Sequence, residues 1–146
     1  MALLSMMALA MTSNSAELDE AQIEQEAMRI LDEFVRSTNA RETEQHVAIL
    51  HHPHYRLAHG TMTIDENEEE LMETNAKFFA GVAKTDWHST EWVHRRIVQI
   101  GESKVHIAGR FARLRKDGSE FDTLDALYVV TKQDGRWGIK LRSSYL

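Results

Sequence analysis

Histidine and arginine are the residues of this chain that could carry chemistry. The 146 residues include 8 histidines and no cysteine, which excludes a thiol nucleophile, thiolate metal sites and disulfides. His94 and Arg96 lie two residues apart in a run of β-forming residues, and therefore share one face of the predicted strand. Histidine transfers protons near neutral pH, and arginine can hold a carboxylate or an enolate-like oxygen. We expect these two side chains to form the centre of a site, the alternative being a structural arginine paired with a helix carboxylate.

A second group of histidines flanks the single proline, Pro53. His51, His52 and His54 resemble a metal cluster, but zinc needs three or four converging ligands and adjacent residues point in different directions. We expect a polar loop here and no metal.

The strand predicted after the proline has two faces. Tyr55, Leu57 and His59 share one of them, and this aromatic, leucine and histidine set is expected on the inner side. His59 would then reach a cavity beside Tyr55. A hydrogen-bonded or rim histidine is the alternative.

The elements that must position these residues are strands joined by tight turns. Asp117-Gly118 and Asp134-Gly135 are strong hairpin signals between runs of β-formers, and Glu102-Ser103 is a third, weaker turn. Two-residue loops at all three turns predict one inner face with four cross-strand rows: Ile100, Val105, Val130, Ile139; Val98, Ile107, Tyr128, Leu141; Arg96, Gly109, Ala126, Ser143; and His94, Phe111, Leu124, Tyr145. Small residues in the third row would leave space for a cavity into which Arg96 points.

Three helices are predicted before these strands. Apolar residues at helical spacing indicate a helix from Ser15 to about Ser37. Asn39 and Glu42 form a possible capping box for a short helix ending before Pro53. Asp65 is a possible cap for a third helix over 66–83, whose first turn is acidic.

Composition narrows the class of protein. The net charge is −6 and there is no basic tract, which disfavours binding to nucleic acid or to an anionic membrane. The apolar segment 1–11 is too short to span a bilayer, and no basic residue precedes Arg29, so secretion is the less favoured alternative to a cytoplasmic location. We expect a tail or helical extension over 1–16 and one domain over 17–146.

The order helix, short helix, strand, helix and four-stranded meander, ending in Asp134-Gly135-Arg136-Trp137-Gly138-Ile139 and Ser143-Ser144-Tyr145, resembles the nuclear transport factor two-like superfamily. Its members include SnoaL-like polyketide cyclases, ketosteroid isomerases, scytalone dehydratases and limonene epoxide hydrolases. The resemblance implies an α+β fold in which a curved antiparallel sheet wraps around N-terminal helices and encloses a cone-shaped cavity, and commonly a homodimer. It does not imply an activity.

Two functions remain open at this point. One is a cofactor-independent isomerase, dehydratase or cyclase that acts on an apolar organic molecule, with His94, His59, Arg96 and Tyr55 as catalytic residues. The other is a ligand-binding or dimerising module without catalysis. In either case the expected walls of the cavity are Trp92, Phe111, Leu124, Tyr145, Trp87 and His88, and the outer sheet face, with Arg110 opposite Asp125, is the expected dimer surface.

Overall fold

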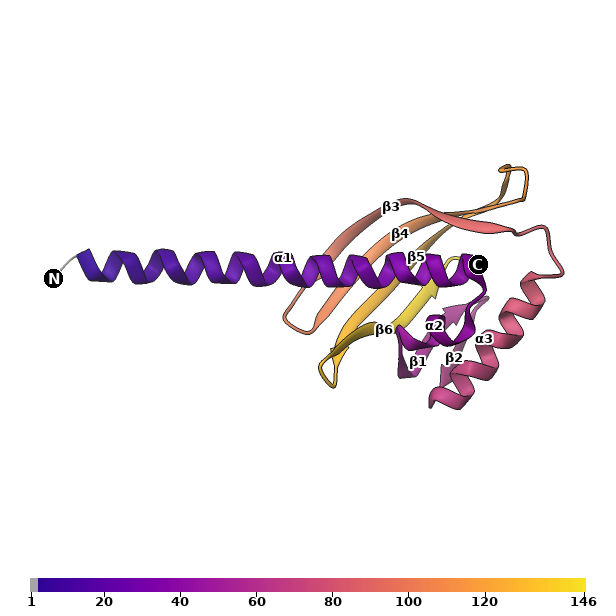
Figure 1. Ribbon diagram of the computed structural model, residues 1–146, viewed down its shortest axis with the longest axis horizontal. Helices are drawn as coiled ribbons and strands as arrows, with labels where there is room; N and C mark the ends of the chain where they lie inside the picture. Colours follow the sequence, from indigo (N-terminus) through magenta and orange to yellow (C-terminus); the bar gives the residue numbers. More distant parts are fainter. Residues whose placement is uncertain (1–2) are drawn as a thin grey trace.

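The computed structural model describes the chain over residues 3–146, with side chains from residue 19 onward, as three helices and one sheet (Figure 1). The helices are α1 (Leu3–Ala40), α2 (Thr43–Ala48) and α3 (Glu68–Val82). The strands are β1 (Leu50–Ala58), β2 (Thr61–Asp65), β3 (Ser89–Ile100), β4 (Lys104–Leu114), β5 (Glu120–Gln133) and β6 (Arg136–Ser144).

The six strands form one curved, open sheet in the order β2-β1-β6-β5-β4-β3. β1 runs parallel to β6, and the other neighbours are antiparallel. Helix α1 lies along the concave face and projects past the sheet at its N-terminal end, whereas α2 and α3 pack together beside β1 and β2 (Figure 1). The predicted α+β fold with helices inside a curved sheet is therefore confirmed. Among the described residues, no helix is both long and apolar enough to cross a membrane.

The core lies between α1 and the concave face of the sheet. Ala27, Ile30 and Leu31 are buried on one side of α1, at the spacing that places them on a single helical face. They meet the first predicted row of the sheet, in which Val105, Val130 and Ile139 are fully buried. This apolar layer fixes α1 across the strands.

The helix starts differ from those predicted. Helix α1 begins at Leu3 rather than at Ser15, and the domain boundary near residue 16 stays a prediction. The cap of α3 is Asn67, whose side chain accepts a hydrogen bond from the Glu70 backbone N–H. Asp65 instead accepts a hydrogen bond from the Thr74 hydroxyl at 2.7 Å, which ties β2 to α3.

The predicted capping box of α2 is also wrong. Asn39 exchanges two hydrogen bonds with the backbone of Thr90, at 2.9 and 2.7 Å, and so anchors the end of α1 to β3. α2 begins after Glu42 without a side-chain cap. The long-range pairing won over the local one because it satisfies a strand end that would otherwise be buried without partners.

The register around the three hairpin turns is confirmed close to each turn. Ile100 pairs with Val105, Gln133 with Arg136 and Phe111 with Leu124. The whole predicted β4–β5 pairing is correct, although the loop at Asp117-Gly118 is longer than two residues and a bulge near Leu114 restores the register.

Bulges overturn the predicted register farther from two of the turns. In β3, an extra residue at Val98 places Ile97 opposite Ile107 and Arg95 opposite Gly109, and a second one at Val93 places Trp92 opposite Phe111. A bulge reverses which residues face inward, because side chains alternate with a period of two. His94 and Arg96 therefore lie on the outer face, where both are exposed.

The same change occurs in β6. Val130 pairs with Ile139 as predicted, but an irregularity at Lys140 places Arg142 opposite Tyr128 and Ser144 opposite Ala126. Leu141, Ser143 and Tyr145 thereby leave the inner face, and Tyr145 is 75% exposed. Arg142 takes the inner position that had been predicted for Leu141.

Strand β1 also presents the opposite face. It starts at Leu50, before Pro53, and its pairing with β6 shifts between Leu50 and Tyr55. His54 and Ala58 are buried on the inner side, so Tyr55 and Leu57 face outward. His59 lies in the exposed turn between β1 and β2, with a positive φ of 53°.

Candidate functional site

A cavity of about 80 Å³ lies between the three helices and the concave face of the sheet. Its volume suits roughly five to eight water molecules, or a ligand of similar size. The lining residues come from all three helices and from five strands or their flanking loops: Phe34, Val35, Thr38, His46, Arg56, Thr74, Asn75, Phe78, Trp87, Thr90, Trp92, Phe111, Arg113, Tyr128, Arg142 and Ser144.

Aromatic rings form the apolar wall of this cavity. The Tyr128 ring meets Phe34 at 5.6 Å and Trp92 at 5.5 Å between centroids, both edge to face. Trp92 also meets Phe111 edge to face, and its indole N–H donates to the Leu31 carbonyl at 3.3 Å. This interlocked set gives the cavity a rigid wall suited to a flat or aliphatic molecular body.

The positions of Trp92 and Gly109 are linked. A Cβ on Gly109 would lie 2.8 Å from Cζ3 of Trp92, a distance that real side chains do not adopt. The indole of Trp92 therefore fills the space that the small residues Gly109 and Ala126 leave beside the sheet. The cavity lies farther along the sheet than the sequence predicted.

Three arginines from three strands line the cavity: Arg56 of β1, Arg113 of β4 and Arg142 of β6. Arg56 and Arg142 are neighbours in the parallel β1–β6 register. Among the described residues, no carboxylate oxygen lies within 4.0 Å of either of these two guanidinium groups, and no lining residue is Asp or Glu. The cavity is therefore a positively charged chamber in a chain of net charge −6.

Arg113 differs slightly from the other two. Its guanidinium stacks 4.0 Å over the Trp87 ring and has one distant ion-pair partner, Asp122, at 3.9 Å. Its buried Nε atom has no hydrogen-bond partner in the described part of the chain. Burial lowers the pKa of Arg113, with the positive charge of Arg56 adding to this effect.

The guanidinium of Arg142 is oriented by His54. His54 donates from Nδ1 to the Ile139 carbonyl at 3.0 Å, so its Nε2 carries the lone pair and accepts from Nε of Arg142 at 3.3 Å. Burial and the Arg142 charge lower the pKa of His54 to about 3, which keeps it neutral. Burial lowers the pKa of Arg142 to about 10. Arg142 thus stays charged at neutral pH, with both terminal nitrogens free of partners among the described residues.

His46 of α2 faces the cavity with a free acceptor. The hydroxyl of Ser37 donates to the Glu33 carbonyl at 2.8 Å and therefore accepts from Nδ1 of His46 at 3.0 Å. Nε2 is then unprotonated, and it has no partner in the described part of the chain. Burial and, secondarily, Arg142 lower the pKa of His46 to about 3.

Asn75 and Tyr128 are two further polar residues of the cavity, and each is 3% exposed. Asn75 donates from its amide nitrogen to the Leu71 carbonyl at 2.8 Å, which leaves its side-chain oxygen without a partner among the described residues. The Tyr128 hydroxyl has none there either. Burial raises the pKa of this hydroxyl to about 12, so it remains protonated and can donate.

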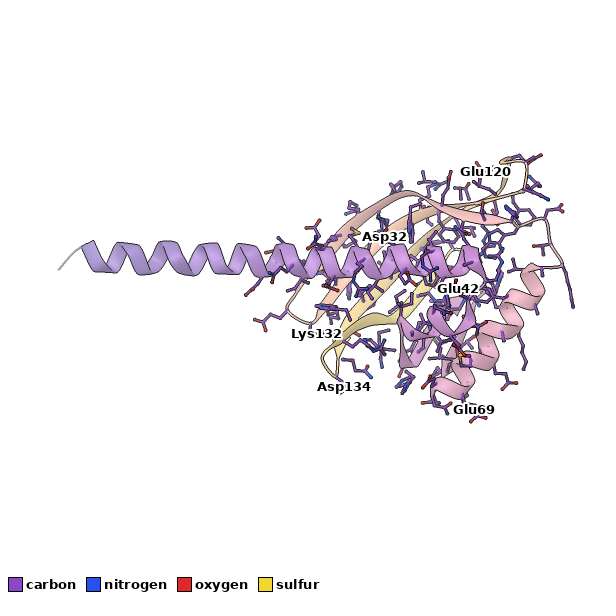
Figure 2. The ribbon with its side chains drawn as sticks, in the orientation of Figure 1. Asp32, Glu42, Glu69, Glu120, Lys132 and Asp134 are labelled. Carbon is purple, nitrogen blue, oxygen red and sulfur yellow. The ribbon has the colours of Figure 1, made fainter. Side chains whose placement is uncertain are left out.

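The structure brings only some of the sequence-predicted site residues together. Trp87, Trp92 and Phe111 line the cavity, whereas His88 lies with Trp87 and Arg41 at a separate hollow. The residues that do not line the cavity are His94, Arg96, His59, Tyr55, Leu124 and Tyr145. The acidic residues Glu69, Glu120 and Asp134 lie at the periphery of the molecule (Figure 2).

Sequence reasoning missed the arginines, His46 and Asn75. The alternation in β4 could have placed Arg113 inward, since it lies two residues from Phe111. Asn75 lies at helical spacing with the buried residues Leu71, Phe79 and Val82 of α3, where a polar residue is itself a signal. Arg142 had no such signal. The register shift that turns it inward occurs at Lys140, and a lysine does not mark a bulge as a glycine or proline would.

Residues 19–142 match the model of the family described as NTF2-like protein (DUF6841). No curated protein matches the chain. Among solved structures, an NTF-2 like protein of unknown function from Shewanella oneidensis has a TM-score of 0.67 at 14% identity, covering 83% of this chain and 97% of that one. An NTF2-like protein from Novosphingobium aromaticivorans has a TM-score of 0.71 at 9% identity, covering 91% and 87%. The association domain of C. elegans CaMKII has a TM-score of 0.66 at 17% identity, covering 86% and 96%.

Proposed function

The chain belongs to the NTF2-like protein (DUF6841) family, and we propose that it binds a small organic anion in the cavity between its helices and the sheet. The observation that carries this proposal is the set of three inward-facing arginines. A guanidinium taken out of water without a partner loses several kcal/mol of hydration. A ligand carboxylate would replace that hydration with charge-assisted, often bidentate, hydrogen bonds.

The rest of the cavity supports an organic rather than an inorganic anion. Trp87, Trp92 and Phe111 are proposed as apolar walls, and a bare inorganic ion would leave them in contact with water. A cavity of about 80 Å³ limits the ligand to a small molecule. The ligand class is therefore a small carboxylate with an apolar body, and no cofactor is needed for this binding.

Calorimetric titration with benzoate and with its neutral isostere benzamide tests the proposal. Benzoate should bind, and benzamide should bind at least tenfold more weakly, because only the carboxylate replaces the hydration of the arginines. Native mass spectrometry of the purified protein provides a second readout, since a co-purified acid would appear as a mass difference that vanishes on denaturation. Equal affinities for the two probes would refute an anion site.

Proton-transfer catalysis, as in an isomerase, dehydratase or cyclase, is the second candidate function. The observation that favours it is the unprotonated Nε2 of His46, which faces the cavity together with the Tyr128 hydroxyl. In this reaction the proton on the carbon beside the carboxylate of an arginine-bound acid passes to Nε2 of His46, and the electron pair left on that carbon moves into the carboxylate as an enediolate held by the guanidinium groups. Exchange of that C–H proton with deuterated solvent, followed by NMR in wild type and His46→Phe, separates a catalyst from a pure binder.

We also propose that the chain forms a homodimer through the outer sheet face. This face carries apolar residues that no other element covers in the described part of the chain, among them Leu57 (39% exposed) and Val98 (45% exposed). The CaMKII association domain, a structural neighbour, is named for an association role. Arg110 and Asp125 pair on this face at 3.1 Å, and both are partly exposed.

A further inference from the structure

Two acceptor groups in the cavity are left unexplained by a simple carboxylate. His46 is 1% exposed and Asn75 is 3% exposed, yet each presents a lone pair to the cavity that no described residue satisfies. Buried polar atoms in folded proteins almost always have a partner, and an unpaired one costs about as much as a lost hydrogen bond. Neither atom is sealed off from the cavity, so a ligand that displaces the cavity water must supply a donor in its place.

The arginines cannot be that donor. His46 and Asn75 belong to the helical side of the cavity, on α2 and α3, whereas Arg56, Arg113 and Arg142 belong to the strands. No hydrogen bond joins the two groups among the described residues. The cavity thus has a donor side made of guanidinium groups and an acceptor side made of a ring nitrogen and an amide oxygen.

The tautomer of His46 is fixed, so its acceptor role is fixed as well. Ser37 receives the Nδ1 proton, and the Ser37 hydroxyl hydrogen is directed to the backbone of α1. The Asn75 amide is fixed in the same way, because its nitrogen donates to the Leu71 carbonyl. Neither group can rotate or change its proton to become a donor without losing a buried hydrogen bond.

We infer that the ligand is a small carboxylic acid that also carries a hydroxyl group, with the carboxylate on the arginines and the hydroxyl donating its one hydrogen to Nε2 of His46 or to the side-chain oxygen of Asn75. This inference rests on the proposed function and adds the second polar group of the ligand. A hydroxyl is the smallest group that donates to one such acceptor and fits the remaining volume. The Tyr128 hydroxyl can donate to either end of such a ligand.

Matched pairs of acids test the inference: benzoate against 2-, 3- and 4-hydroxybenzoate, propionate against lactate and 3-hydroxypropionate. Each is titrated calorimetrically into the wild-type protein. At least one hydroxylated acid should bind three- to tenfold more tightly than its parent, the gain expected from one net hydrogen bond. If no hydroxylated acid binds more tightly than its parent, the inference is overturned.

Substitutions of His46 and Asn75 test which group of the cavity binds the ligand hydroxyl. In His46→Phe or in Asn75→Leu the ratio of the dissociation constants of parent and hydroxylated acid should shrink to within twofold, while the matched outer-face variant His94→Phe should keep the wild-type ratio. A ratio unchanged in both cavity variants would also overturn the inference. The outcomes separate the two proposals: parent acids that bind without a hydroxyl preference leave the anion site standing, and acids that do not bind at all refute both.

Discussion

Arg142 occupies a position that weakens the fold and suits a ligand. It takes a charged group into the concave side of the sheet, opposite Tyr128, where the sequence predicted Leu141. Its only described hydrogen bond is to a neutral histidine, and its favourable charge partner, Asp65, acts from beyond ion-pair distance. Weakly compensated charge of this kind is typical of binding sites, where stability is given up for recognition.

Arg142→Met should therefore make the ligand-free protein more stable. Replacing a buried charged group by an apolar side chain of similar length is neutral to stabilising, and we expect a gain of about 1–3 kcal/mol in the free energy of unfolding. Urea denaturation in a buffer without organic acids measures it. Arg96→Met, at an exposed position of the outer face, should stay within about 0.5 kcal/mol of wild type. A clear loss of stability in Arg142→Met would mean that the guanidinium has a structural partner.

Three buried histidines predict how stability depends on pH: His46, His54 and His51, whose pKa is also lowered by burial. The pKa values of His46 and His54 are lowered to about 3, whereas an unfolded histidine titrates near 6.5. The unfolded chain then binds more protons between these values, so stability falls as the pH drops below about 6.5, by up to about 1.4 kcal/mol per pH unit for each histidine.

Urea denaturation between pH 7 and pH 4.5 measures this slope above the range in which most carboxylates titrate. Among single substitutions, His46→Phe should reduce the slope by roughly a third to a half, and the exposed His94→Phe should leave it unchanged. A slope in His46→Phe equal to that of wild type would show that His46 is already protonated in the folded state.

The strand register could be predicted from the sequence near each hairpin turn, but not beyond the bulges in the strands. The β4–β5 pairing is correct along its whole length because the Asp117-Gly118 turn, with its flanking bulge, preserves the register. The pairings of β3 and β6 are correct only up to Val98 and Lys140. Bulges supply the curvature that a cone-shaped sheet needs, but the residues that form them here have no distinctive type. Each bulge exchanged inner for outer residues, and this exchange moved His94 and Arg96 out and brought Arg95 and Arg142 in.

Gly109→Ala tests the packing of β4 against β3. The new methyl group would lie 2.8 Å from the Trp92 ring, so the indole must shift and the aromatic wall with Phe111 and Tyr128 must repack. We expect a loss of about 1–3 kcal/mol in the free energy of unfolding, measured by chemical denaturation. Gly101→Ala is the matched control, since its new methyl group lies 3.6 Å from the nearest atom and should cost less than 1 kcal/mol. Equal effects of the two substitutions would contradict the close contact of Trp92.

The net charge of the chain does not reveal the charge of the cavity inside it. A net charge of −6 describes the periphery, where acidic residues such as Glu69 and Asp134 lie (Figure 2). The cavity has the opposite sign, because three strands distant in sequence each contribute one arginine. The order of elements was enough to predict the fold, whereas the site depended on which side each strand turns inward.

The outer sheet face is the part of the molecule that the proposed homodimer requires. Leu127 lies on this face between Ala108 and Ser143, so Leu127→Glu should convert the dimer to a monomer by placing a charge in the interface. Sedimentation equilibrium measures the mass. Ala76→Glu, at an exposed position of α3, should leave the dimer intact. A wild-type chain that sediments as a monomer at high concentration would contradict the proposal.

The central claim is that Arg142 and its neighbours hold the carboxylate of a small organic acid. The most direct measurement is calorimetric titration of benzoate into the wild-type protein, Arg142→Met and the outer-face control Arg96→Met. We predict that Arg142→Met weakens benzoate binding by about 10- to 100-fold, the loss expected for hydrogen bonds to a charged group, while Arg96→Met binds as wild type does. Equal benzoate affinity in all three proteins would contradict the account.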